Sequence, residues 1–165
     1  MKLPSVFLGA ALLCVVAAAI GADTSSPAPS PSGGGWSAAG KSEDPALKSA
    51  REAIAAGDYS GAQATLKPAV AANPGNADMH NLYAYSIRKG ANPDMELVFK
   101  HYNEALRIDP KHRGANEYIG EAYLMVGNLP KAKEHLAELN KLCFFGCAEY
   151  DMLKKAVAAY EAKGK

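Results

Sequence analysis

The 165-residue sequence has no excess of charge of either sign, since 18 lysines and arginines stand against 17 aspartates and glutamates. This balance argues against a nucleic-acid-binding protein, which would carry a clustered basic surface. It argues equally against a polybasic membrane anchor. The sequence also has little cysteine and little tryptophan, with three residues of the first kind and one of the second.

The common catalytic motifs are absent as well. The sequence contains no glycine-rich phosphate loop, no nucleophile elbow and no His-Glu-x-x-His zinc motif. Glu117 and Glu121 stand four residues apart, a spacing open to an acid–base pair, but nothing near them in the sequence indicates desolvation. We therefore interpret them as a solvated acidic face and expect a protein that is not an enzyme and has no cofactor.

A long apolar run occurs once, within residues 1–22. Lys2 is the only charge there, residues 6–20 are apolar, and residues 21–22 form a small-residue cleavage site, with 17–19 as the alternative. This is the pattern of a secretory signal peptide. The run is marginal for a permanent membrane span, which needs about 20 predominantly apolar residues. We expect an exported protein with no stable membrane span after the signal is cleaved.

Residues 23–43 have the composition of a linker. They are rich in serine, proline, glycine and alanine, with too little apolar surface to offset the entropy of ordering. We expect the proline-rich part to be extended and the triglycine at 33–35 to be flexible. Trp36 has two interpretations: an incidental aromatic in a disordered tail, or an anchor that docks on a partner or folds back onto the rest of the chain.

The remaining sequence nearly repeats itself. The recurring positions are Gly57-Asp58-Tyr59, Ala62, Leu66, Ala69 and Pro74, then Tyr102, Ala105, Leu106 and Asp109-Pro110, then Gly120, Tyr123, Gly127-Asn128-Leu129, Ala132 and Leu136. Pro74 and Pro110 are 36 residues apart, close to the period of about 34 residues of a stacked helical hairpin. Small residues recur where two helices must approach closely, so we expect Ala62 and Ala132 to be buried.

Local signals predict seven helices and no strand in residues 44–163. We expect hairpins at about 44–76, 77–110 and 111–142, followed by a capping helix at 148–163 with a polar outer face that includes Lys154 and Lys155. Asp44-Pro45 has the pattern of a helix start. Pro68 lies inside the second helix and predicts a kink or a break there.

These recurring residues resemble the tetratricopeptide repeat consensus over roughly residues 44–142. Residues 142–150, which contain two cysteines four apart, are similar to the ending of a group of small exported bacterial tetratricopeptide proteins, which implies a periplasmic location. The resemblance implies an all-α, right-handed solenoid of about three helical hairpins plus a capping helix, whose concave groove binds a partner protein or peptide. By repeat position, that groove would display Leu47, Arg51, Ile54, Asn81, Tyr85, Arg88, Glu117, Glu121 and Leu124.

The two cysteines outside the leader, Cys143 and Cys147, leave a choice of roles. In an exported protein an even pair indicates a structural disulfide. The alternative is a periplasmic thiol-redox or metal-handling protein that uses the pair for copper or zinc, with His135 and Met152 as further soft ligands. His80 and His101 fall on apolar helix faces and are interpreted as hydrogen-bonded core histidines, so we assign no metal site.

Overall fold

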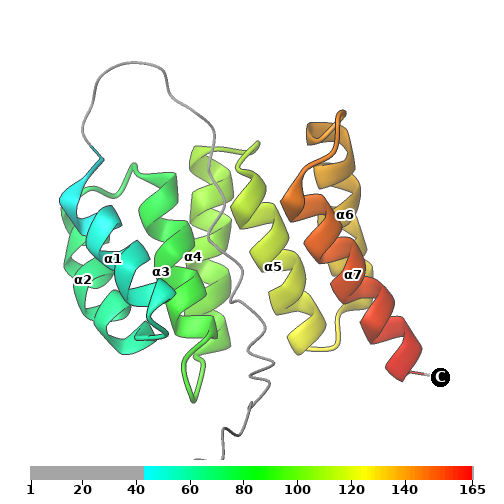
Figure 1. Ribbon diagram of the computed structural model, residues 1–165, viewed down its shortest axis with the longest axis horizontal. Helices are drawn as coiled ribbons and strands as arrows, with labels where there is room; N and C mark the ends of the chain where they lie inside the picture. Colours follow the sequence, from blue (N-terminus) through cyan, green and yellow to red (C-terminus); the bar gives the residue numbers. More distant parts are fainter. Residues whose placement is uncertain (1–42, 165) are drawn as a thin grey trace, which may run out of the picture.

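The computed structural model describes residues 43–164, which form seven α-helices and no strand (Figure 1). The helices are α1 (Pro45–Ala55), α2 (Tyr59–Ala72), α3 (Ala77–Arg88), α4 (Met95–Ile108), α5 (Arg113–Met125), α6 (Leu129–Leu142) and α7 (Ala148–Lys163). The all-α prediction is confirmed for this part of the chain. The signal peptide expected at 1–22 and the linker segment that contains Trp36 lie outside the described residues.

Each of the seven helices begins at a residue whose side chain accepts a hydrogen bond from a backbone N–H of the first turn. The capping residues are Asp44, Asp58, Asn76, Asp94, His112, Asn128 and Cys147. The turns after α1 and α5 contain Gly57 and Gly127 with φ of 75° and 78°, a backbone conformation that glycine adopts without steric cost. Local chemistry therefore fixes where the helices begin and end.

The break predicted at Pro68 does not occur. Helix α2 continues through this proline to Ala72. Leu66 and Val70, on either side of Pro68, are both buried in the core. Their packing holds this segment helical, although the proline removes one backbone hydrogen bond.

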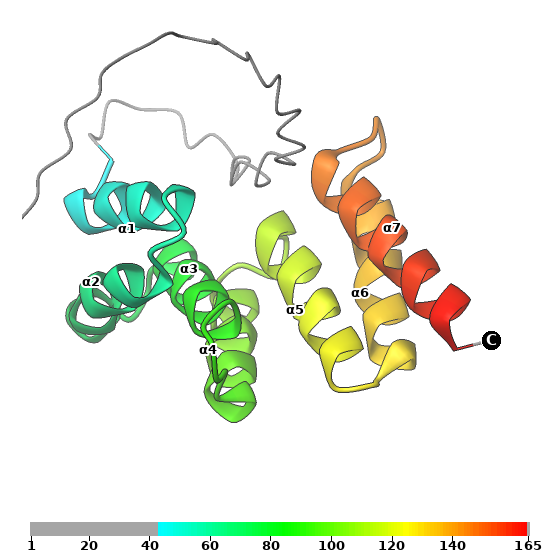
Figure 2. The same cartoon turned by 60° about the horizontal axis from the view of Figure 1, so that its bottom comes forward.

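The helices form two layers along the stack. Helices α1, α3, α5 and α7 contact one another in series, whereas α2, α4 and α6 contact only members of that first layer. Figure 2 shows the resulting arrangement, with hairpins α1–α2, α3–α4 and α5–α6 followed by α7. Because one layer is close-packed and the other is spread apart, the stack curves into a right-handed solenoid whose inner side is the layer of α1, α3, α5 and α7.

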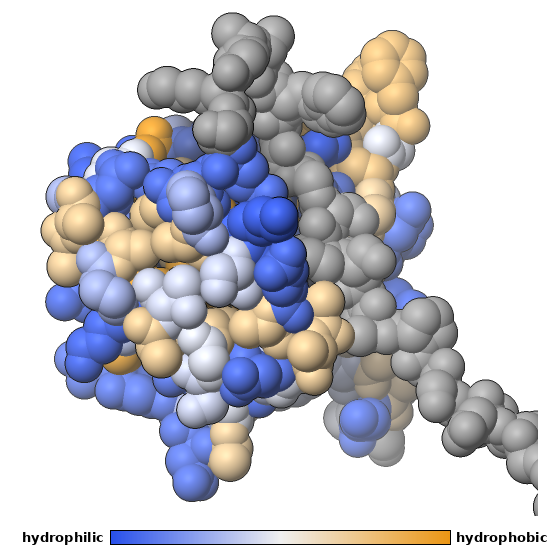
Figure 3. Space-filling view, turned by 60° about the vertical axis from the view of Figure 1, so that its left-hand side comes forward, coloured by the Kyte–Doolittle hydropathy of each residue, from blue (hydrophilic) through white to orange (hydrophobic). Residues whose placement is uncertain are grey.

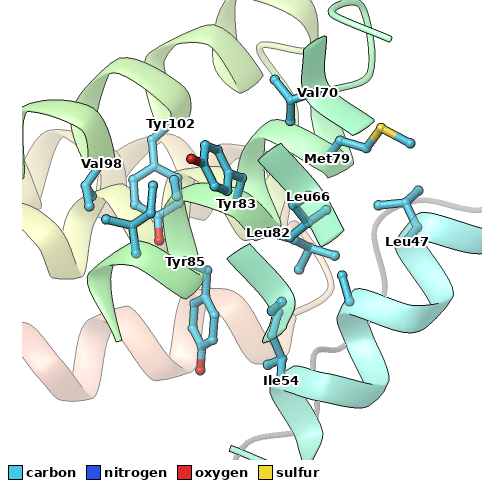
Figure 4. Close-up of a cluster of buried hydrophobic side chains, with 14 of the residues drawn as sticks. Leu47, Ile54, Leu66, Val70, Met79, Leu82, Tyr83, Tyr85, Val98 and Tyr102 are labelled. Carbon is cyan, nitrogen blue, oxygen red and sulfur yellow. The ribbon is translucent and has the colours of Figure 1, made fainter. Parts of the chain in front are cut away.

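The buried core consists of two clusters that lie one after the other along the stack. One cluster of buried side chains joins α1 to α5, with Leu66, Met79 and Tyr102 among its fully enclosed members, and Figure 4 shows its central part. A second, smaller cluster joins α6 and α7 through Leu139 and Leu153. The end of the stack that faces the viewer in Figure 3 carries hydrophilic residues around scattered apolar ones, as a solvated end requires.

Candidate functional site

Side chains of α3, α5 and α7 surround a hollow of about 370 Å³ on the inner layer. Its lining residues are Tyr85, Arg88, Lys89, Glu117, Tyr118, Glu121, Met152, Lys155, Ala156 and Ala159. Four of the nine residues predicted for the groove meet here: Tyr85, Arg88, Glu117 and Glu121. Three consecutive helices of the inner layer therefore contribute to one concave site.

Arg88, at the end of α3, is a buried cation with its charge balanced. Its Nη2 forms an ion pair of 2.8 Å with Glu121 Oε2, and its Nε donates a hydrogen bond of 3.3 Å to the hydroxyl of Tyr102. The geometry of the ion pair falls short of a hydrogen bond, so Nη2 has no acceptor among the described residues. Burial disfavours the charge, but Tyr102 and Glu121 together raise the pKa of Arg88, so the guanidinium stays charged.

Two tyrosine rings complete the surroundings of this guanidinium. Arg88 Cζ lies 5.4 Å from the ring centroid of Tyr85 and 5.7 Å from that of Tyr118, within the range of cation–π attraction. The two rings are 4.6 Å apart and tilted by 44°. The hydroxyl end of Tyr85 points away from the centre of the core in Figure 4. The floor of the hollow is therefore aromatic and rigidly packed.

The interpretation of Glu117 as part of a solvated acidic face is wrong, because the residue is buried. The residue is only 2% exposed and lines the hollow. Burial, helped by the nearby carboxylates of Glu121 and Glu149 and opposed by Arg88, raises the pKa of Glu117 to about 9. Near neutral pH, Glu117 is therefore an uncharged carboxylic acid at the wall of the hollow.

The other predicted groove residues lie elsewhere. Leu47 and Ile54 are 6% and 7% exposed and belong to the core, so they are not displayed on an open surface (Figure 4). Leu124 packs on the α6–α7 cluster. Arg51 makes ion pairs with Glu43 at 2.9 Å and Asp78 at 3.9 Å. Asn81 is buried, and its Oδ1 has no hydrogen-bond partner among the described residues.

Sequence reasoning missed the wall that α7 contributes. Met152, Lys155, Ala156 and Ala159 line the hollow, although Lys155 was expected on the outer face of the cap. Their spacing of three, four and seven residues marks one face of a helix, so a signal existed. Tyr118 was missed as well, and it carries no comparable signal, because its neighbours in the sequence do not show that α3 lies opposite.

The buried histidines form a separate pair. His80 Nε2 donates to the carbonyl of Pro74 at 3.1 Å, which leaves His80 Nδ1 to accept from His101 Nδ1 at 2.9 Å. Burial and, to a smaller extent, the neighbouring His80 lower the pKa of His101 to about 4. His101 is therefore neutral near pH 7, and the two rings are hydrogen-bonded in the core, as the sequence predicted, outside the hollow.

The cysteines join the last two helices. Cys143 follows α6, Cys147 caps α7, and the two form a disulfide with Cα atoms 5.5 Å apart. His135 Nδ1 is hydrogen-bonded to Asn116 Oδ1 at 3.0 Å. Within residues 43–164, no three His, Cys, Asp or Glu side chains gather as a metal site would require. None of the described helices has the length and apolar character of a membrane span.

A second hollow, of about 540 Å³, lies beside the loops that follow α1 and α3. Its carboxylates are already engaged, because Asp58 Oδ1 caps α2 and Asp94 Oδ1 caps α4.

Comparisons with known proteins agree with the architecture. No protein-family model matches the chain, and no curated protein matches it in sequence. Among solved structures, the type III secretion translocator chaperone SycD of Yersinia enterocolitica superposes with a TM-score of 0.62 at 15% identity, over 72% of this chain and 83% of that chain. An alternative dimer of SycD gives a TM-score of 0.61 at 15% identity, over 73% and 92%.

The first TPR domain of human RPAP3 is similar as well, with a TM-score of 0.59 at 16% identity, over 71% of this chain and 93% of that domain. Sequence identities of 15–16% show a similarity of fold only. The chain has the fold of a tetratricopeptide-like helical solenoid.

Proposed function

We propose that this protein is an exported interaction scaffold of the bacterial periplasm that holds a partner protein or peptide on the inner layer of its solenoid. The observation that carries the proposal is the hollow between α3, α5 and α7, where an aromatic floor adjoins charged groups. Aromatic and arginine side chains are the residues most often found at the centres of protein interfaces. The apolar stretch within residues 1–22 supports export.

The solenoid architecture supports the same function. Stacked helical hairpins build extended concave surfaces, which repeat proteins use for binding. SycD, which shares this fold, is named as a translocator chaperone, a role that requires contact with another protein. The identity of the partner of the present chain does not follow from that likeness.

A crosslinking experiment tests which face binds. A photo-reactive amino acid is placed at Ala159, an exposed residue that lines the hollow, and in a matched variant at Lys100, an exposed residue of α4 in the other layer. We expect illumination of living bacteria to give a discrete adduct from position 159 and none from position 100. Equal yields from both positions would contradict the proposal.

The tail offers a second control. Deleting residues 23–42 should leave the adduct at position 159 unchanged if the solenoid itself holds the partner. Loss of the adduct in this deletion would place binding in the segment around Trp36, and the solenoid would then only carry that segment.

A further inference from the structure

The hollow between α3, α5 and α7 carries two lysines whose charges no neighbour balances. Lys89 and Lys155 are exposed at its rim, and neither forms an ion pair with another described residue. By contrast, Lys131, Lys133 and Lys141 of α6 each pair with a glutamate at 2.6 to 2.8 Å. Unbalanced cations at the rim of a hollow attract a carboxylate.

The other charged groups at the hollow do not neutralise these two lysines. Arg88 Nη2 and Glu121 Oε2 form an ion pair at 2.8 Å, and Glu149 pairs with Arg113 at 3.8 Å. Glu117 is buried in the wall. Even with Glu117 counted as charged, three cations line the hollow against two carboxylates. The hollow is therefore basic whichever form Glu117 takes.

The inside of the hollow suits an apolar group. The rings of Tyr85 and Tyr118 are 4.6 Å apart on one side, and Met152 and Ala156 of α7 line the other. A mainly apolar lining with a few polar groups is the usual form of a binding pocket. A free inorganic anion would leave this apolar surface uncovered, whereas a side chain that enters the hollow would bury it. The geometry thus combines an apolar pocket with a basic rim.

We propose that the hollow binds a segment of the partner in which an aromatic side chain enters the pocket and an acidic side chain on each side of it pairs with Lys89 or Lys155. This inference rests on the proposed function and names the chemistry of the partner. Helices α3 and α7 both pack on α5 and not on each other, so the two lysines stand on opposite sides of the hollow. In an extended segment, successive side chains point in opposite directions, so the acidic ones stay at the rim when the aromatic one enters.

Short peptides test the proposed chemistry. The probes are Ser-X-Phe-X-Ser peptides, acetylated and amidated so that their ends carry no charge, with X as glutamate, glutamine or lysine. Binding to the mature protein is followed by two-dimensional NMR. We expect the glutamate peptide to shift the amides of Tyr118 and Met152 and to bind at least about fivefold more tightly than the glutamine peptide. The lysine peptide should bind most weakly.

The aromatic anchor is tested separately. Replacing the phenylalanine of the glutamate peptide by alanine should weaken binding at least about tenfold, because the buried apolar surface is lost. Added salt should reduce the advantage of glutamate over glutamine, since it screens pairs at an exposed rim. It should leave the effect of the phenylalanine in place.

Charge reversal at the rim identifies the residues that select the peptide. The Lys155→Glu variant should bind the lysine peptide more tightly than the glutamate peptide, and Lys89→Glu should shift the preference in the same direction. The matched variant Lys154→Glu changes the net charge equally, at an exposed position of α7 that does not line the hollow. It should keep the preference of the unmodified protein. Circular dichroism checks that all three variants keep their helicity.

Several outcomes would overturn the inference. Equal affinity for the three peptides, or a preference for lysine, would remove the lysines from recognition. Equal effects of Lys154→Glu and Lys155→Glu would show that net charge, and not the hollow, selects the peptide. Binding only of peptides with a free terminal carboxylate would show that the site recognises a chain end. Binding only after deletion of residues 23–42 would make the tail of this chain the occupant.

The crosslinking experiment separates failure of this inference from failure of the proposed function. If adducts form at position 159 while the glutamate peptide does not bind or shows no preference, the inference fails and the proposed function stands. If adducts form only at position 100, the proposed function itself fails.

Discussion

Arg88 and Glu117 are two buried ionisable residues of one site, and their surroundings differ. Arg88 has an ion pair, a hydroxyl partner and two aromatic rings around it. Glu117 is buried, and the carboxylates of Glu121 and Glu149 act against its ionisation. A buried, unpaired acid stays neutral and destabilises the fold at any pH where the unfolded chain would ionise it. Residues retained at such a cost are frequently functional.

The Glu117→Gln variant should therefore be more stable than the unmodified protein at neutral pH. The pKa of Glu117 is about 9 in the folded chain against an ordinary value of 4.5. Between these values the folded state keeps a proton that the unfolded state releases, so the free energy of unfolding falls as pH rises. Glutamine keeps the shape without this cost, and we expect a gain of about 1–3 kcal/mol at pH 7. Urea denaturation at pH 5 and pH 8, with Glu96→Gln at an exposed position of α4 as control, measures it.

A gain that is the same at both pH values would show that ionisation of Glu117 is not its cause. No gain at either value would show that the carboxyl has a partner after all.

The titration of His101 should make the free energy of unfolding rise with pH, opposite to the effect of Glu117. His101 has a pKa of about 4 in the folded chain against an ordinary 6.5, so the unfolded state binds the extra proton between these values. The free energy of unfolding contributed by this group therefore rises with pH across that window, by about 1–2 kcal/mol. The effect is best measured by denaturation between pH 4 and pH 7 in the Glu117→Gln background, where the opposing titration is absent. A flat profile there would contradict the neutral pairing of His80 with His101.

At the scale of helices, small residues set how closely the elements approach. Ala62 and Ala132 are 0% exposed, which confirms the burial predicted from the repeat pattern. Gly120 of α5 lies against α7 so closely that a Cβ built on it would be 2.5 Å from Leu153 Cδ2. The wall that α7 adds to the hollow depends on this approach.

The Ala62→Leu variant tests the packing of the first hairpin. Forcing extra methylenes into a filled core typically costs about 1–3 kcal/mol, so we expect a melting temperature several degrees lower. Ala64→Leu, at an exposed position two residues along the same helix, should change it little. An unchanged melting temperature in Ala62→Leu would mean that α2 does not pack on its neighbours as described.

Helix boundaries were predictable because their signals are local, whereas the site was predictable only in part. Asp44, Asp58 and Gly57 act within one turn of where they stand. The burial of Glu117 depends on α3 and α7, which approach from about 30 residues away on either side in the sequence. Repeat position alone placed Leu47 and Ile54 on an open groove, but α1 packs against α2 and α3, and both side chains belong to the core.

At the scale of the molecule, the disulfide holds the final helix on the solenoid. It joins the end of α6 to the start of α7. Because α7 provides one wall of the hollow, the bridge also supports the site. Between the two cysteines, Phe144 and Phe145 are 85% and 96% exposed, so the loop itself adds little to the core.

Removing the bridge should lower stability without removing the fold. Closing so short a loop contributes about 2 kcal/mol in the chain-entropy model, and the Cys143→Ser/Cys147→Ser variant should lose about that much. Thermal melting with and without reductant, at matched helicity by circular dichroism, measures the loss. An unchanged melting temperature would show that the disulfide does not stabilise the fold. Reversible redox cycling of the pair near physiological potentials would instead support the thiol-redox alternative.

The central claim is that the inner layer holds a buried, neutral acid at the wall of its hollow. The most direct test is a pH titration of the Glu117 side-chain carboxyl by carbon-13 NMR, with assignment by the Glu117→Gln variant. The structure predicts a pKa of about 9, more than four units above the ordinary value of 4.5. A pKa near 4.5 would show that the carboxyl is solvated or paired, and Glu117 would then be an ordinary charged group of the hollow.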